Sequence, residues 1–111
     1  MRAFFYYKPM DISDEVLLRE TSLLLKSSMP DQQSIEANSM NDLQQRLSLH
    51  INKMLRDDYE GLLHLLYRID VDENKFREAI ASKNTSDISS NLSKLIIDRM
   101  INKIILRKRY S

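Results

Sequence analysis

The sequence has no cysteine and very little glycine or proline, with one glycine, Gly61, and two prolines, Pro9 and Pro30, in 111 residues. A chain without cysteine has no disulfide, no thiolate nucleophile and no cysteine-based zinc site, and this fits a reducing compartment such as the cytoplasm. Sheet proteins of this length need several glycines or Asn-Gly pairs for their tight turns. The composition therefore favours a helical, cytoplasmic protein.

The sequence also lacks a long apolar run and a strong net charge. No stretch approaches the roughly 18 consecutive apolar residues that a membrane span requires, and the N-terminal residues lack the apolar core and cleavage site of a signal peptide. We therefore expect no membrane partner. Because the formal net charge is only +1, binding of nucleic acid would depend on a local cluster of cations.

Apolar residues recur with helical spacing in five segments of the chain, which has the length of one domain. The expected helices cover about 13–27, 40–56, 58–69, 70–84 and 87–108. Residues 28–39 are polar and weakly patterned, which predicts a flexible loop. The sequence thus predicts an all-α protein with a single domain over residues 1–111, folded as a compact bundle of four to five helices.

The apolar pattern also predicts which side chains face the core. The last helix carries the broadest apolar arc, which fits a central helix or one that also forms a dimer seam: Ile88, Leu92, Leu95, Ile96, Ile97, Met100, Ile101, Ile104 and Ile105. In the other helices, residues expected to face inward include Val16, Leu17, Leu23 and Leu24; Tyr59, Leu62, Leu63, Leu66 and Ile69; and Phe76, Ala79 and Ile80. Since glycine costs roughly 1 kcal/mol in a helix interior, Gly61 predicts the close approach of a neighbouring element.

Four aromatic residues stand together near the N-terminus, in a segment that Pro9 keeps from being helical. We expect residues 1–9 to form an extended arm that packs on the bundle or on a second copy of the chain. The residues that would make this interaction surface are Phe4, Phe5, Tyr6 and Tyr7.

Glu60, His64 and Arg68 are spaced four apart and therefore line one helix face. They form either a small acid–base or anion site, or a solvated stripe of the kind common on helix surfaces. Neither a nucleophile nor an oxyanion-binding loop accompanies them, so we expect no catalytic residues, no cofactor and no enzymatic activity. A structural alternative is an ion pair between Arg68 and Asp98 of the last helix.

Asp70, Asp72 and Asn74 have the spacing of the first three ligands of a calcium loop. Lys75 stands where that loop needs glycine, and Ala81 where it needs glutamate. We therefore interpret these acids as helix caps and expect no metal site.

The chain ends in a cationic cluster made of Lys103, Arg107, Lys108 and Arg109. Cations are favoured at a helix C-terminus by the helix dipole, but they also suit contacts with a phosphate backbone. The second interpretation is distinguished by whether these cations join others, such as Lys94 and Arg99, on one exposed face.

The segment from Leu65 to Phe76, Leu-Leu-Tyr-Arg-Ile-Asp-Val-Asp-Glu-Asn-Lys-Phe, follows Ile-Asn-Lys-Met-Leu-Arg-Asp-Asp-Tyr at 51–59 and precedes Leu-Ile-Ile-Asp-Arg at 95–99. With these flanks it resembles a group of short uncharacterised all-helical bacterial proteins, over about residues 47–108. The resemblance implies an autonomous helical domain in a bacterial cytoplasm, and it carries no functional residues over to this chain.

The sequence has more apolar surface than a core of this size needs and lacks a recognisable catalytic grouping. It therefore predicts a non-enzymatic protein-interaction module. It would bind itself, as a homodimer, or another protein, through an apolar helix face or the aromatic arm. The alternative is a weak nucleic-acid-binding accessory protein that uses the basic end of the last helix.

Overall fold

A computed structural model of the chain describes residues 12–29 and 35–109, which form five helices and no strand. The helices are α1 (Asp14–Ser28), α2 (Met40–Asp57), α3 (Tyr59–Ile69), α4 (Glu73–Ile80) and α5 (Thr85–Arg109). This confirms the predicted all-α fold. The aromatic arm at 4–7 and the middle of the predicted loop, residues 30–34, lie outside the described residues. None of the described helices is both long and apolar enough to span a bilayer.

Each helix begins where a side chain accepts a hydrogen bond from the first turn. The hydroxyls of Ser13 and Ser39 cap α1 and α2, and the carboxylates of Asp58 and Asp72 cap α3 and α4. The amide oxygen of Asn84 accepts from the backbone N–H two residues on, at 2.9 Å. Because Asn84 can supply this cap, α5 begins two residues earlier than the acids of its first turn suggest.

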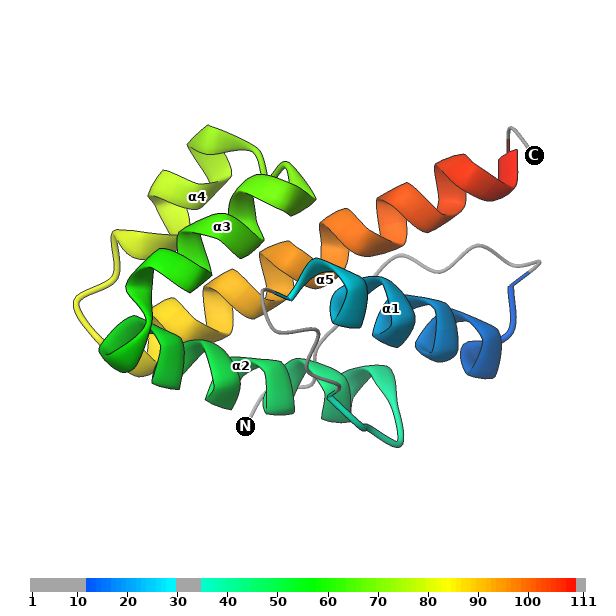
Figure 1. Cartoon of the computed structure of the whole chain (residues 1–111), viewed down its shortest axis with the longest axis horizontal. Helices are drawn as coiled ribbons and strands as arrows, with labels where there is room; N and C mark the ends of the chain where they lie inside the picture. Colours follow the sequence, from blue (N-terminus) through cyan, green and yellow to red (C-terminus); the bar gives the residue numbers. More distant parts are fainter. Residues whose placement is uncertain (1–11, 30–34, 110–111) are drawn as a thin grey trace.

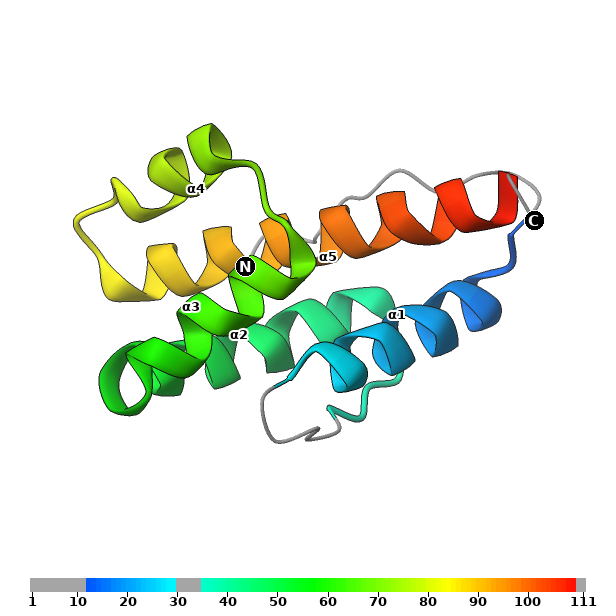
Figure 2. The same ribbon diagram turned by 45° about the horizontal axis from the view of Figure 1, so that its top comes forward.

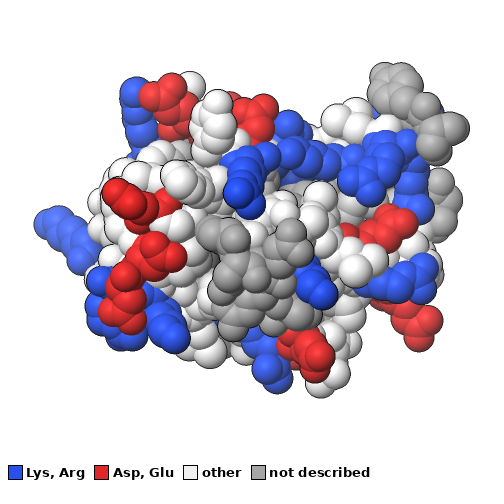
Figure 3. All heavy atoms as spheres, in the orientation of Figure 1, with Lys and Arg blue, Asp and Glu red and all other residues white. Residues whose placement is uncertain are grey.

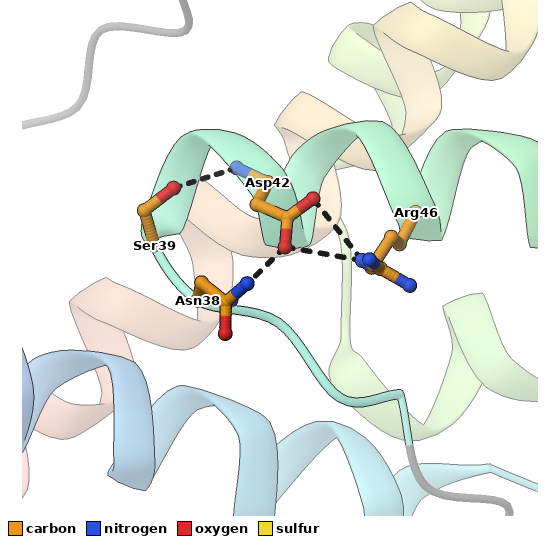
Figure 4. A network of polar contacts seen from close by, with 4 residues as sticks. All are labelled: Asn38, Ser39, Asp42 and Arg46. Atoms are coloured by element: carbon orange, nitrogen blue, oxygen red, sulfur yellow. Dashed lines mark hydrogen bonds and ion pairs between the residues drawn. The ribbon is translucent and has the colours of Figure 1, made fainter.

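The start of α2 carries the most extensive of these caps (Figure 4). The Ser39 hydroxyl accepts from the Asp42 N–H at 3.0 Å, while the Asp42 carboxylate accepts from the Asn38 N–H, also at 3.0 Å. Arg46, one turn on, donates from Nε to both Asp42 oxygens at 3.1 Å. The hydrogen bonds from Asn38 and then Arg46 lower the pKa of Asp42. This arrangement resembles a capping box and confirms the predicted start of the helix.

Helix α5 is the centre of the bundle and contacts each of the other four helices. It runs diagonally across the molecule, with α1 and α2 along one side and α3 and α4 beside its N-terminal half (Figures 1 and 2). Its side chains Ile96, Ile97 and Met100 are completely buried. The broad apolar arc therefore packs within one chain, as expected of a central helix.

Small polar residues line the contact between α2 and α5. Gln44 is buried and donates from Nε2 to the Ser93 hydroxyl at 2.9 Å, and the Ser89 hydroxyl donates to Asn52 Oδ1 at 3.2 Å. On α1, Thr21 is also buried, but its hydroxyl has no hydrogen-bond partner among the described residues. Most of the polar groups inside the bundle are thus paired across helices, and Thr21 is an exception.

On α1 and α4, two residues expected in the core are exposed instead. Leu23 is 60% exposed, because the buried face of α1 runs through Leu17, Thr21 and Leu25, and Leu23 points away from that row. Ile80 is 40% exposed, since the eight-residue helix α4 fully buries only Ala79.

The nearest neighbour of Gly61 is the residue that caps its own helix, at the junction of α2 and α3. A Cβ placed on Gly61 would meet, as its nearest atoms, the carboxyl group of Asp58. That carboxylate accepts the Gly61 N–H at 3.0 Å as the cap of α3. The glycine therefore makes room for the helix cap.

Candidate functional site

Helix α3 carries a row of apolar side chains on its outer face. Tyr59, Leu63 and Tyr67 follow one another at four-residue spacing and are 52%, 39% and 87% exposed. The core side of α3 is formed by Leu62, Leu65, Leu66 and Ile69. The expectation that Tyr59 and Leu63 belong to the buried arc is therefore wrong. The buried arc is centred nearer to Leu65, so Tyr59 and Leu63 lie beyond its edge and face the solvent. We call Tyr59, Leu63 and Tyr67 the α3 row.

The α3 row borders an apolar groove between α3 and α4. The groove measures about 160 Å³, and Leu63, Leu66, Tyr67, Val71, Glu73 and Phe76 line it. It forms because α3 ends in a Schellman turn, in which the Val71 N–H donates back to the Leu66 carbonyl at 3.3 Å. Such a turn brings an apolar residue beyond the helix against its last turn, and here Val71 and Leu66 line the same groove.

The polar residues Glu60, His64 and Arg68 lie one position after the members of the α3 row and are all exposed. Glu60 and His64 make no hydrogen bond or ion pair within the described part of the chain, and Arg68 donates to the Ser28 carbonyl at 3.5 Å. The structure thus places the three side chains on one open helix face, outside the grooves beside α4.

The ion pair that joins α3 to α5 differs from the predicted one. Arg99 donates from Nε to the Asp70 carbonyl at 3.1 Å and lies 3.7 Å from its carboxylate. The expected pair between Arg68 and Asp98 is not formed. Asp98 lies instead in the groove between α4 and α5, near two lysines.

That second groove is larger, about 600 Å³, and is lined by acidic, basic, amide and apolar side chains. Partial burial raises the pKa of Asp98, although the charges of Lys75 and Lys94 oppose the shift. Asp72 and Glu78 also line the groove. The groove therefore carries charges of both signs, which do not select a ligand of one sign.

The cationic cluster lies along the C-terminal half of α5, where Figure 3 shows a run of Lys and Arg side chains. Lys108 pairs with Glu20 of α1 at 3.2 Å, and Arg99 is bound to Asp70. Lys94 lies in the groove between α4 and α5. The two cations proposed to extend the cluster, Lys94 and Arg99, thus have other contacts, and Lys103, Arg107 and Arg109 remain as its other members.

The acids near residue 70 act at helix ends. The Asp72 carboxylate accepts from the N–H groups of Asn74 and Lys75 at 2.9 and 3.1 Å, as a cap does. Asp70 ends α3 in a left-handed conformation. Within residues 12–29 and 35–109, no group of three His, Cys, Asp or Glu side chains has the arrangement of a metal site.

Comparison of the chain with protein-family models, curated proteins and solved structures finds no match. The similarity to short bacterial helical proteins stays a prediction. The α3 row with its groove is a surface that the sequence pattern did not predict. A signal for it was present, because Tyr59, Leu63 and Tyr67 have perfect four-residue spacing on a helix that already has a separate apolar side.

Proposed function

We propose that this protein is a non-enzymatic protein-interaction module that binds through the α3 row and the adjoining groove. The observation that carries the proposal is the 87% exposure of Tyr67 beside an apolar groove. Aromatic residues, tyrosine among them, are enriched at protein interfaces, where they supply a large contact area. We place the module in a bacterial cytoplasm, on the absence of cysteine and on the resemblance of residues 47–108.

The size of the groove supports a side-chain ligand. An apolar cavity of about 150 Å³ holds a molecule the size of benzene, and the groove between α3 and α4 measures about 160 Å³. It would take one large apolar side chain of a partner. Tyr67 and Leu63 would then pack around that side chain and exclude water from it, as the residues around an interface anchor do.

The flanking polar groups suit this function better than catalysis. Glu60, His64 and Arg68 are exposed, so a substrate bound there would remain in contact with water. Charged groups at the rim of an interface mainly provide specificity and orientation.

The test is photo-crosslinking in cells that produce the protein, with a photoreactive phenylalanine analogue in place of Tyr67. Leu49 provides the matched control, because it is an exposed apolar residue on α2, 72% exposed and outside the proposed surface. We expect a discrete protein adduct from position 67 and none from position 49. Equal labelling from both positions, or no adduct from position 67, would refute the proposal.

A second candidate function is weak nucleic-acid binding by the cationic cluster. It is favoured by one observation: no acidic residue occurs after Asp98 in the sequence, while all four cations of the cluster follow in α5. Binding through so few cations would weaken steeply with salt. An electrophoretic shift assay at low salt, with a Lys103→Gln, Arg107→Gln double variant as control, tests it; no shift with the unchanged chain at low salt refutes it.

A further inference from the structure

The outer face of α3 carries two neighbouring rows of side chains, one apolar and one polar, and the two rows differ in their symmetry along the helix. The α3 row, Tyr59, Leu63 and Tyr67, reads the same forwards and backwards. The polar row beside it, Glu60, His64 and Arg68, reverses its charges when read backwards. The apolar row therefore presents the same residue types to a second copy in either orientation. The polar row matches opposite charges only when it faces an antiparallel copy of itself.

From this pattern we infer that the occupant of the α3 surface is a second copy of the chain, packed with the two α3 helices antiparallel about a twofold axis near Leu63 and His64. The inference rests on the proposed function and specifies its partner. A twofold axis perpendicular to two antiparallel helices keeps each flank of one helix on the same flank of the other. The α3 row therefore meets its own copy, and so does the polar row.

In this arrangement Glu60 faces the partner subunit's Arg68, and the same pair forms again on the other side of the axis. Tyr59 likewise faces the partner subunit's Tyr67. A parallel arrangement about a twofold axis would instead set the polar row of each helix against the α3 row of the other, so Glu60 and Arg68 would gain no partner of opposite charge. Because only the antiparallel arrangement pairs opposite charges across the contact, the charges favour that orientation.

The side chains concerned are available for such pairing. Glu60 has no hydrogen bond or ion pair with any other described residue, and Arg68 makes one contact, at 3.5 Å, with the Ser28 carbonyl. The α3 side chains Glu60, His64, Tyr67 and Arg68 are all exposed. Neither the Glu60 nor the Arg68 side chain therefore has to break a strong interaction before it binds the second copy.

The contact is small, so the dimer is expected to be weak. An eleven-residue helix is about 16 Å long, at 1.5 Å per residue. Interfaces below about 1,200 Å² are typical of weak and transient complexes. We therefore expect a dissociation constant on the order of micromolar or above.

The experiment measures the mass of the full chain by sedimentation and light scattering, from about 1 μM to about 1 mM, a range that brackets a weak interface. The variants are Glu60→Arg and Arg68→Glu, studied alone and as an equimolar mixture. We expect the unchanged chain to dimerise and each variant alone to dissociate, with affinity reduced by at least about tenfold. The mixture restores the dimer, because one variant supplies only cations and the other only acids at the two positions.

Glu78→Arg and Lys53→Glu are the matched controls, since they make the same changes of charge at exposed positions of α4 and α2. These two controls should dimerise as the unchanged chain does. In the mixture of Glu60→Arg and Arg68→Glu, native mass spectrometry should show dimers that contain one copy of each variant. A chain that is monomeric at every concentration, or a dimer insensitive to both α3 variants, overturns the inference. A crosslink from position 67 to a different protein would overturn it while leaving the proposed function intact.

Discussion

Arg99 of α5 donates a hydrogen bond from Nε to the backbone carbonyl of Asp70, at 3.1 Å, at the point where α3 ends. Asp70 there has a φ of 63°, in the left-handed region that few residues other than glycine, asparagine and aspartate adopt readily. The Arg99 side chain is 29% exposed, so this bond is partly shielded from water. Arg99 therefore joins the turn that forms the α3–α4 groove to the central helix.

Replacing Arg99 with methionine should lower the free energy of unfolding by about 1 kcal/mol, because the apolar stem is kept while the hydrogen bond is lost. Urea denaturation measures the change. Arg77→Met is the control: its ion pair with Glu73 is shorter, 2.7 Å, but both side chains are largely exposed. We expect a change of only a few tenths of a kcal/mol there. Equal losses in the two variants would contradict the role assigned to Arg99.

Much of the fold was predictable because local signals and core packing agree. The helical spacing of apolar residues in five segments and the broad apolar arc of the last helix each indicate a feature that the structure contains. The apolar pattern predicted less well whether apolar residues at the edge of a helix's buried face lie in the core or in solvent. Leu23 and Tyr59 have the apolar character of core residues, yet the neighbouring helices leave both exposed.

The candidate surface was harder to predict than the fold, because it depends on what covers each face. The polar row was visible in the sequence as Glu60, His64 and Arg68, but its relation to the exposed Tyr67 required the position of the core. The pair between Arg99 and Asp70 was missed for a similar reason. Asp70 becomes a partner for Arg99 only once the end of α3 has been placed against α5.

Thr21→Val should stabilise the protein by about 1 kcal/mol, since valine has nearly the shape of threonine without a hydroxyl that must be desolvated. The Thr21 side chain is fully buried, and within residues 12–29 and 35–109 its hydroxyl lacks a hydrogen-bond partner. Thermal and urea denaturation measure the effect. Thr21→Ser keeps the hydroxyl and removes a methyl group, so it should destabilise the protein. A loss of stability in the valine variant would show that the hydroxyl is paired in solution.

Asp42→Asn should destabilise the protein at neutral pH, and the difference from the unchanged chain should shrink as the pH falls below 3.8. Hydrogen bonds from Asn38 and Arg46 lower the pKa of Asp42 in the folded state from that ordinary value. A lowered pKa means that stabilisation is present above the unfolded-state pKa and is lost as the pH falls through the folded-state pKa. Urea denaturation between neutral and acid pH tests this; a difference independent of pH would contradict it.

Asp98→Asn should have the opposite effect and stabilise the protein at neutral pH. Partial burial between α4 and α5 raises the pKa of Asp98, so the folded state prefers the protonated carboxyl group. The stabilising contribution of a raised pKa is present below 3.8 and is lost as the pH rises through the folded-state value. The advantage of asparagine should therefore vanish in acid, as denaturation across the same pH range would show. A destabilised variant at neutral pH would mean that Lys75 and Lys94 outweigh the burial.

Gly61→Ala should have little net effect on stability by itself, because two changes oppose each other. Alanine gains about 1 kcal/mol over glycine in a helix, but its Cβ would collide with the Asp58 carboxyl group that caps α3. Loss of such a cap costs about 1 kcal/mol. In an Asp58→Ala background the cap is already absent, so the same substitution should then stabilise the protein by about 1 kcal/mol. Urea denaturation of the four chains gives the coupling energy, and a coupling near zero would show that the cap can move aside without loss.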